Sequence, residues 1–290
     1  MSHIIETKNL TKKFGNLTAV DGISFSVDKG EIFGLLGPNG AGKSTTISML
    51  CTILKVTSGT AIVNGFDVTK NPSEVRKSIG IVFQDPSIDD KLTARENLEM
   101  HADLYSVPVQ VKKERIDSVL ALVELEDRAD DLMNTFSSGM RRRLEIARSL
   151  IHYPKILFLD EPTIGLDPQS RDHIWSYIRE LIKTEDITII LTTHYMEEAD
   201  KLCGRIAIVD HGKIVALDTP QNLKNQLGGE TITVTTKQKE LFLKKIQEAN
   251  IVKSAVIVGE EVKMTVDNAH TVLPVVVDIA SKNSLFIDSI

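Results

Sequence analysis

The chain has 290 residues, of which 42% are hydrophobic and 26% are charged, as expected of a globular protein that buries a sizeable core. Its 34 basic and 40 acidic residues leave a net charge of −6, which gives no overall reason to expect nucleic-acid binding, and no apolar run approaches the roughly 18 residues that a membrane-spanning helix needs. The chain has two cysteines, Cys51 and Cys203, and its N-terminus lacks the pattern of a secretion signal, which together predict a reducing cytosol and buried thiols. Any membrane role is expected to run through a partner.

The first segments, residues 4–10 and 22–27, alternate apolar and polar side chains in the way of half-buried strands. They predict an antiparallel edge of the fold. Between them Phe14 stands among polar and turn residues. Its surroundings alone favour the interpretation that Phe14 is a hydrophobic residue packed under a loop. The functional alternative is that its ring stacks on a base.

A glycine-rich stretch follows the apolar strand predicted at residues 32–36 and leads into a helix that begins near Thr45. Its residues are Gly37, Pro38, Asn39, Gly40, Ala41, Gly42, Lys43 and Ser44. Glycines let backbone N–H groups curl around an anion, and the helix N-terminus adds its positive dipole end. The stretch predicts a phosphate-binding loop in which Lys43 reaches the terminal phosphates and Ser44 offers its hydroxyl to Mg²⁺. The alternative is a turn that binds nothing.

Further strands are predicted at residues 60–63 and 79–83, and Gln84 lies at the end of the second. From about residue 92 to 151 the leucines recur at helical spacing, which predicts a helical subdomain in which Pro108 separates two helices. Ser137 and Gly139 open the last of these helices. They form either an N-cap before a solvated basic face or a second anion site.

The run at residues 156–159 suits a strand buried on both faces of a parallel sheet, and it ends in Asp160 and Glu161. Ligands of such sheets bind at the carboxyl ends of the strands. Asp160 is therefore predicted to anchor Mg²⁺ and Glu161 to orient or deprotonate a water, unless both only cap the next turn. A strand at residues 187–191 delivers His194 to the same edge, and strands at 205–209 and 213–217 complete the sheet.

Residues after 228 alternate short strand and helix patterns without candidate site residues. Strands are predicted at 231–235, 252–258, 262–266 and 285–287, with helices at 237–250 and 270–281. This βαββαβ order predicts a small ferredoxin-like domain.

Together these motifs resemble those of the ATP-binding cassette family, the ATPase subunits of ABC transporters, over about residues 4–227. The matching motifs are the Walker A loop at residues 37–44, the Q-loop at Gln84, the Walker B strand at 156–161, the D-loop at 165–167 and the switch histidine at His194. Residues 137–140 take the place of the signature motif, usually Ser-Gly-Gly-Gln, and depart from it at Ser138 and Met140.

The resemblance implies roles for these residues. Lys43, Gln84, Glu161 and His194 take part in catalysis, and Ser44, Gln84 and Asp160 hold Mg²⁺. Phe14 falls where the family places the aromatic ring that stacks on adenine, which favours the functional alternative for it. Two cassettes pair head to tail in this family, so that ATP on the loop of one meets Ser137 and Gly139 of the other.

We therefore expect an α/β fold, a P-loop NTPase cassette with a mixed sheet core, an antiparallel β edge and a helical subdomain, followed by a small α+β domain. The expected boundaries are residues 1–228 for the cassette, with the helical subdomain at about 92–151, and 229–290 for the C-terminal domain.

The expected function is that of an ATPase subunit with ATP and Mg²⁺ as cofactors, acting as a homodimer. It would drive an integral membrane permease from the cytoplasmic face of the cell membrane, with residues 89–98 as the docking surface. The sequences at residues 140–145 and 193–199 most resemble those of the ATPases of drug-resistance exporters, which implies export of a drug-like or lipophilic substrate. The alternatives are a soluble cassette ATPase acting on ribosomes or DNA, an importer-type subunit, and a regulatory module that does not hydrolyse ATP.

Overall fold

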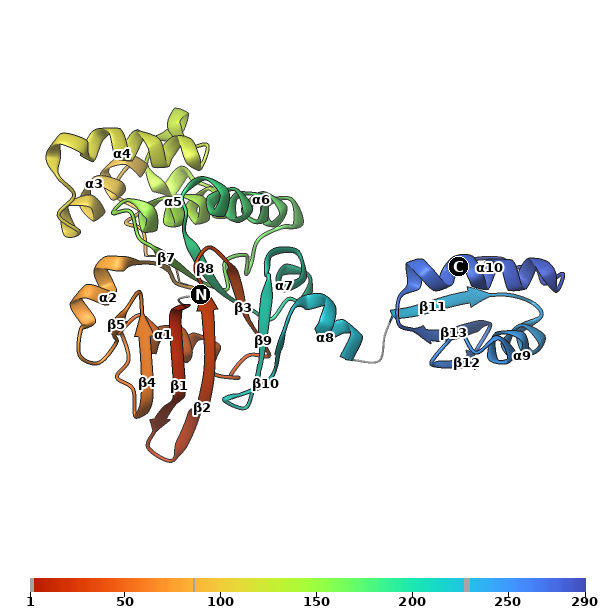
Figure 1. The fold of residues 1–290 in the computed structure, drawn as a ribbon. Helices are drawn as coiled ribbons and strands as arrows, with labels where there is room; N and C mark the ends of the chain where they lie inside the picture. The colour runs from red at the N-terminus through yellow and green to blue at the C-terminus, as the bar shows by residue number, and fades with distance from the viewer. Residues whose placement is uncertain (1–2, 86, 227–229) are drawn as a thin grey trace. The chain divides into compact units, whose positions relative to one another are not determined.

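The structure, a computed structural model, describes residues 3–85, 87–226 and 230–290 (Figure 1). The chain divides into two compact units, Met1–Asp218 and Thr219–Ile290. The domain boundary predicted at residues 228 and 229 lies outside the described residues. Within the described ranges, none of the helices combines the length and the apolar character that crossing a membrane requires.

An antiparallel sheet of four strands forms one part of the first unit, in the order β2-β1-β4-β5. Its strands are β1 (His3–Phe14), β2 (Leu17–Asp28), β4 (Ser58–Val63) and β5 (Phe66–Asp67). The two strands of the hairpin, β1 and β2, extend beyond the predicted strands at residues 4–10 and 22–27, because their pairing continues to Phe14 opposite Leu17. The segment around Phe14 is therefore strand and tight turn rather than a loop.

The second sheet of this unit has six strands in the order β10-β9-β3-β8-β7-β6. They are β3 (Ile32–Leu36), β6 (Ile79–Val82), β7 (Ile156–Asp160), β8 (Thr188–Thr193), β9 (Arg205–Asp210) and β10 (Lys213–Asp218). All neighbours pair in parallel except β10, which is antiparallel to β9. The carboxyl ends of β3, β7 and β8 therefore meet at one edge, which is where the candidate residues of the sequence follow their strands.

Helices α1 (Lys43–Leu50), α2 (Pro72–Ser78), α6 (Pro168–Thr184) and α7 (Met196–Leu202) accompany these sheets. The predicted helical region holds α3 (Ala94–Leu104), α4 (Val109–Leu122), the 3₁₀ turns η1 (Glu126–Arg128) and η2 (Met133–Thr135), and α5 (Ser138–Leu150). Pro108 is the N-cap of α4 and so separates it from α3. Helices α2 and α7 have seven residues each, too few for a clear helical period, and the sequence pattern missed them.

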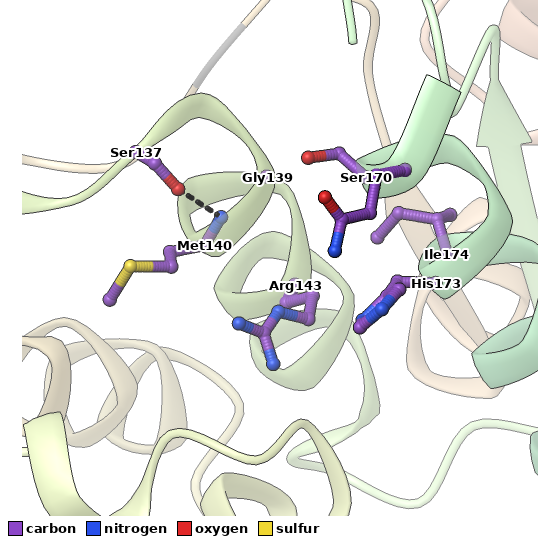
Figure 2. Close-up of a pocket in the computed structure, with 8 residues that line it drawn as sticks. Ser137, Gly139, Met140, Arg143, Ser170, His173 and Ile174 are labelled. Atoms are coloured by element: carbon purple, nitrogen blue, oxygen red, sulfur yellow. Dashed lines mark hydrogen bonds between the residues drawn. The ribbon is translucent and has the colours of Figure 1, made fainter. Parts of the chain in front are cut away.

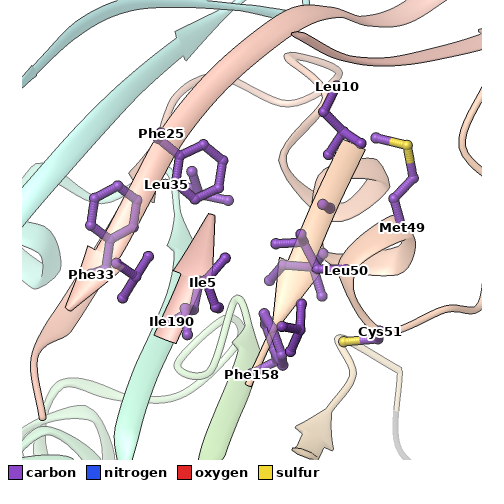
Figure 3. Close-up of a cluster of buried hydrophobic side chains, with 14 of the residues drawn as sticks. Ile5, Leu10, Phe25, Phe33, Leu35, Met49, Leu50, Cys51, Phe158 and Ile190 are labelled. Carbon is purple, nitrogen blue, oxygen red and sulfur yellow. The ribbon is translucent and has the colours of Figure 1, made fainter. Parts of the chain in front are cut away.

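The core of the first unit packs the antiparallel sheet and α1 against strands of the six-stranded sheet (Figure 3). The rings of Phe25 and Phe33 stack with their centroids 5.3 Å apart. Cys51 and Cys203 are both free and buried, and burial raises the pKa of both thiols well above the ordinary value. This core fixes β3 and α1, the two elements that the glycine-rich loop connects.

The second unit contains α8 (Pro220–Gln226), β11 (Glu230–Thr235), α9 (Lys239–Ala249), β12 (Ser254–Val258), β13 (Glu261–Val266) and α10 (Ala269–Lys282). Its sheet has three strands in the order β11-β13-β12. The predicted fourth strand at 285–287 is wrong: past α10 the chain makes only an isolated bridge between Thr235 and Ser289. Leu285 is buried and Phe286 is 80% exposed, so the alternation that suggested a strand is present, but the segment does not form the ladder of backbone pairs that a strand requires.

Candidate nucleotide site

The loop between β3 and α1 packs so closely that two of its positions exclude a side chain. A Cβ on Gly37 would lie 2.1 Å from the carbonyl oxygen of Val209, and a Cβ on Gly42 would lie 2.4 Å from that of Ala19. Gly42 also has φ of 104°, a left-handed conformation that favours glycine, and it is the N-cap of α1. The strand is thus joined directly to a helix N-terminus, where unpaired N–H groups and the helix dipole favour an anion.

Lys43 places its ammonium group beneath this loop. Its Nζ donates to the carbonyl oxygens of Gly37 at 2.8 Å and Pro38 at 3.0 Å, and it lies 3.5 Å from Oε1 of Glu161. Only 4% of the Lys43 side chain is exposed. A cation held this far from water interacts strongly with a nearby phosphate, because the local dielectric is low.

Ser44 and Asp160 meet although they are far apart in the sequence. The hydroxyl of Ser44 donates to Oδ1 of Asp160 at 3.0 Å, and the hydroxyl of Thr192 donates to the same oxygen. Asp160 ends β7 and Thr192 lies in the neighbouring β8, so the pairing of the two strands holds the carboxylate in place. A carboxylate and a hydroxyl this close form a pair of oxygen ligands of the kind that Mg²⁺ prefers.

Glu161 adopts a left-handed backbone conformation with φ of 48°, which costs a residue with a side chain on the order of 1 kcal/mol. Its N–H donates to the carbonyl oxygen of Thr192 at 3.2 Å and to its hydroxyl at 3.0 Å. The carboxylate lies between two groups, with Oε1 near Lys43 and Oε2 3.3 Å from Nδ1 of His194. Nδ1 of His194 is buried without a hydrogen-bond partner among the described residues, so the contact with Glu161 is close without being a hydrogen bond.

Gln84 and Glu161 line one cleft together with the loop. The cleft has a volume of about 260 Å³, and the residues that line it are Ala19, Asn39, Gly40, Gly42, Lys43, Ser44, Thr45, Gln84 and Glu161. No group of three or more His, Cys, Asp or Glu side chains suited to a metal occurs among the described residues. Ser44, Gln84 and Asp160 offer a hydroxyl, an amide oxygen and a carboxylate, which is a donor set that fits Mg²⁺.

Phe14 is not among the residues that line this cleft. It ends β1 at the tight turn to β2, where 46% of it is exposed and the ammonium of Lys12 lies 4.8 Å from the centre of its ring. The ring is therefore accessible, as stacking on a base requires, and it is not packed under a loop.

Ser137 and Gly139 lie at a different pocket, of about 130 Å³ (Figure 2). Ser137 is the N-cap of α5 and accepts a hydrogen bond from the N–H of Met140 at 3.3 Å. A Cβ on Gly139 would lie 3.0 Å from Oγ of Ser170, at the start of α6. The residues that line this pocket are Ser137, Gly139, Met140, Arg143, Gln169, Ser170, His173 and Ile174, and none of them lines the cleft.

The predicted residues thus fall into three places. Lys43, Ser44, Gln84, Asp160, Glu161 and His194 come together around the cleft, while Phe14 lies at the β1–β2 turn and Ser137 and Gly139 lie at the second pocket.

Sequence reasoning missed two residues that hold the cleft together. Thr192 lies between the strand predicted at 187–191 and His194 and has no predicted role, yet its hydroxyl donates to Asp160 and accepts from the N–H of Glu161. Arg142 lies in the run for which a solvated basic face is one of the two predicted alternatives, yet it is buried and donates to the turn that contains Glu161. The sequence signal for Arg142 is its spacing from Glu145, one helical turn away, with which it forms an ion pair at 2.9 Å.

A family model described as "ABC transporter" matches residues 20–164. The linearmycin resistance ATP-binding protein LnrL of Bacillus subtilis is 43% identical over 269 residues, covering 92% of this chain and 86% of that protein. The daunorubicin/doxorubicin resistance ATP-binding protein DrrA of Streptomyces peucetius is 46% identical over 228 residues, covering 79% and 69%. The ATP-binding cassette MJ0796, solved as a dimer in a post-hydrolysis state with ADP and Pi, superposes with a TM-score of 0.67 at 27% identity, covering 74% of this chain and 98% of that one.

Proposed function

The chain belongs to the ABC transporter family as a subunit that binds and hydrolyses ATP, and we propose that it drives a membrane permease that exports a drug-like or lipophilic substrate. The proposal of export is supported by the two resistance proteins to which it is similar along most of their length. The observation that carries the proposed catalysis is the Glu161 carboxylate, which lies at the cleft between the Lys43 ammonium and the His194 ring.

We assign the triphosphate of ATP to the loop and to the N-terminus of α1. Lys43 would neutralise charge on the β- and γ-phosphates, since its ammonium is the buried cation beneath the loop. Ser44, Gln84 and Asp160 would hold Mg²⁺, which when bound neutralises charge that develops on the phosphate oxygens. Phe14 would stack on the adenine.

The proposed reaction is attack of a water on the γ-phosphorus. Glu161 orients the water and accepts its proton, a P–O bond forms, and the bond from the γ-phosphorus to the β–γ bridging oxygen breaks to release ADP. His194 would hold the side of the Glu161 carboxylate that faces it, because its Nδ1 lies 3.3 Å away. Positioning and charge stabilisation supply most of the rate in phosphoryl transfer, so the fixed direction of this carboxylate matters.

The proposed assembly is a head-to-tail homodimer in which ATP on the loop of one copy meets Ser137 and Gly139 of the other. Support comes from the second pocket, where the N-terminus of the 13-residue helix α5 offers N–H groups and a dipole suited to phosphate but lies outside the cleft of its own chain. We place the dimer on the cytoplasmic face of the membrane, held there by the permease. Residues 89–98 are the proposed docking segment.

Glu161→Gln tests this function. The change keeps the shape of the side chain and removes the proton acceptor, so ATP hydrolysis by the purified full chain should fall about 100- to 1000-fold. ATP binding should persist, and ATP with Mg²⁺ should trap a dimer that size-exclusion chromatography detects.

The matched control is Glu197→Gln on α7, where the carboxylate is 62% exposed and pairs with Lys201. Hydrolysis by this variant should stay close to that of the unmodified chain. Near-normal turnover in Glu161→Gln would remove Glu161 from the catalytic role.

A further inference from the structure

Arg142 binds three successive carbonyl groups of the turn that contains Glu161. Its Nε donates to the carbonyl oxygen of Pro162 at 2.8 Å, and its Nη2 donates to those of Asp160 at 3.0 Å and Glu161 at 3.2 Å. Only 8% of the Arg142 side chain is exposed. One buried guanidinium on α5 therefore holds the backbone at the end of β7.

The remaining donors of Arg142 bind the backbone just before Gln84 and the side chain of Glu145 on the same helix. Its Nη1 donates to the carbonyl oxygen of Phe83 at 2.6 Å and to Oε2 of Glu145 at 2.9 Å. Oε1 of Glu145 in turn accepts from the N–H of Ser87 at 3.0 Å. The five N–H donors of the guanidinium thus make five hydrogen bonds, which a lysine ammonium with three donors at a single point cannot reproduce.

The turn that Arg142 binds is one that needs support. Glu161 has φ of 48°, a conformation that persists only where surrounding contacts determine it. On one side its N–H donates to Thr192 of β8, and on the other side Arg142 binds its carbonyl oxygen. The direction of the Glu161 side chain toward Lys43 and His194 follows from a backbone that is fixed at both ends.

We propose that Arg142 is a positioning residue for ATP hydrolysis: by binding the carbonyl oxygens of Asp160, Glu161 and Pro162 it sets the direction of the Glu161 carboxylate. Because Ser137 is the N-cap of the same helix α5, the guanidinium also ties the catalytic turn of one copy to the helix end proposed to meet the nucleotide of the other. This inference rests on the proposed role of Glu161.

The test is Arg142→Lys in the full chain, measured by steady-state hydrolysis of Mg-ATP. The value of kcat should fall about 10- to 100-fold, because a displacement of about 1 Å at a catalytic group has an effect of that size. KM should change little, since the loop and Lys43 are untouched. If Arg142 had a purely structural role, the variant would contain less folded protein, but the folded fraction would keep both the kcat and the KM of the unmodified chain.

A double variant separates positioning of Glu161 from other effects. In single-turnover hydrolysis, Arg142→Lys combined with Glu161→Gln should be no slower than Glu161→Gln alone, because residues that act through one another are not additive. The double variant should also still form the dimer that ATP traps.

The matched control is Arg115→Lys on α4. The Arg115 side chain is 4% exposed and its Nη2 donates to the carbonyl oxygen of Leu150 at 2.7 Å, so the exchange removes an equally buried guanidinium elsewhere. It should lower the melting temperature, by less than Arg142→Lys because fewer hydrogen bonds are lost, and leave kcat within about twofold, since it lies outside the unit that acts on the water.

A second variant, Glu145→Gln, tests the inference should Arg142→Lys not fold. The Glu145 carboxylate accepts from Arg142 with one oxygen and from Ser87 with the other, whereas the single amide oxygen of glutamine can accept from only one of them in this geometry. We therefore expect a loss of kcat smaller than that in Arg142→Lys, with KM unchanged.

The inference is overturned if Arg142→Lys or Glu145→Gln folds and keeps the kcat of the unmodified chain while Glu161→Gln loses hydrolysis. It is also overturned if the rate losses of Arg142→Lys and Glu161→Gln multiply in the double variant. Persistence of hydrolysis in Glu161→Gln itself would instead overturn the proposed function.

Discussion

The cleft and the second pocket hold the two groups of candidate residues, and they differ in how their polar groups are held. At the cleft Lys43, Asp160 and Glu161 are buried and bound to one another or to neighbouring strands. At the second pocket Ser137 is exposed, and its hydroxyl accepts from the N–H of Met140 within its own helix end. The polar groups of the cleft are thus held by contacts within this chain, whereas in the proposed dimer the helix end at the pocket would be covered by the other copy. Mutations in the two halves of the proposed site are therefore expected to have different effects.

Lys43→Ala should give the largest effect and tests the cleft side. Loss of the buried ammonium removes a positive charge from beneath the phosphates, so hydrolysis should fall about 100- to 1000-fold and ATP should bind more weakly. Binding of a fluorescent ATP analogue and release of phosphate measure the two effects. An ATP affinity equal to that of the unmodified chain would show that the cleft does not use this cation.

Ser137→Ala should give an intermediate effect and tests the pocket side. The helix loses its N-cap, which costs about 1 kcal/mol of stability, and the ATP-trapped dimer should weaken about tenfold while the ATP affinity of the single chain stays unchanged. Sedimentation in the Glu161→Gln background measures the dimer.

Asn268→Ala provides the control for Ser137→Ala, because Asn268 caps α10 in the same way, accepting from the N–H of Thr271 at 3.2 Å. It should cost similar stability and leave the dimer intact. If both variants weakened the dimer equally, the role of Ser137 would reduce to capping.

Asp167→Asn should give the smallest effect. The hydroxyl and the N–H of Ser170, a residue that lines the second pocket, hold the pKa of Asp167 below its ordinary value of 3.8. A carboxyl group whose pKa is lowered by folding stabilises the fold above the pKa of the unfolded chain, and this contribution disappears as the pH falls through the lower folded value.

Thermal melts of the Asp167→Asn variant should therefore give a slightly lower melting temperature than the unmodified chain near neutral pH, and this gap should close as the pH falls below about 4, because only the unmodified chain loses the contribution there. The same slope in both proteins would mean that Asp167 adds nothing to acid unfolding.

Much of the cleft could be predicted from the sequence because its determinants are local. The loop needs glycines beside a strand and a helix start, all within residues 32–50, and Asp160, Glu161 and His194 each follow an apolar run that predicts a buried strand. The mistaken strand at 285–287 and the missed helices α2 and α7 are short segments, in which packing against the rest of the fold outweighs any pattern in the residues.

The phosphate-binding loop, the polar residues that follow the buried strands and the similarity to a family could all be predicted from the residues alone. What each of three consecutive arginines does depends on the folded structure. Arg142 is buried against the turn of Glu161, while Arg141 pairs with Asp90 and Arg143 bonds the carbonyl oxygen of Val123. Their partners lie in segments distant in the chain, and the face of α5 that packs on β6 is set by long-range packing rather than by residue type. For this reason a run that looks uniformly basic in the sequence contains one residue that holds the proposed catalytic glutamate.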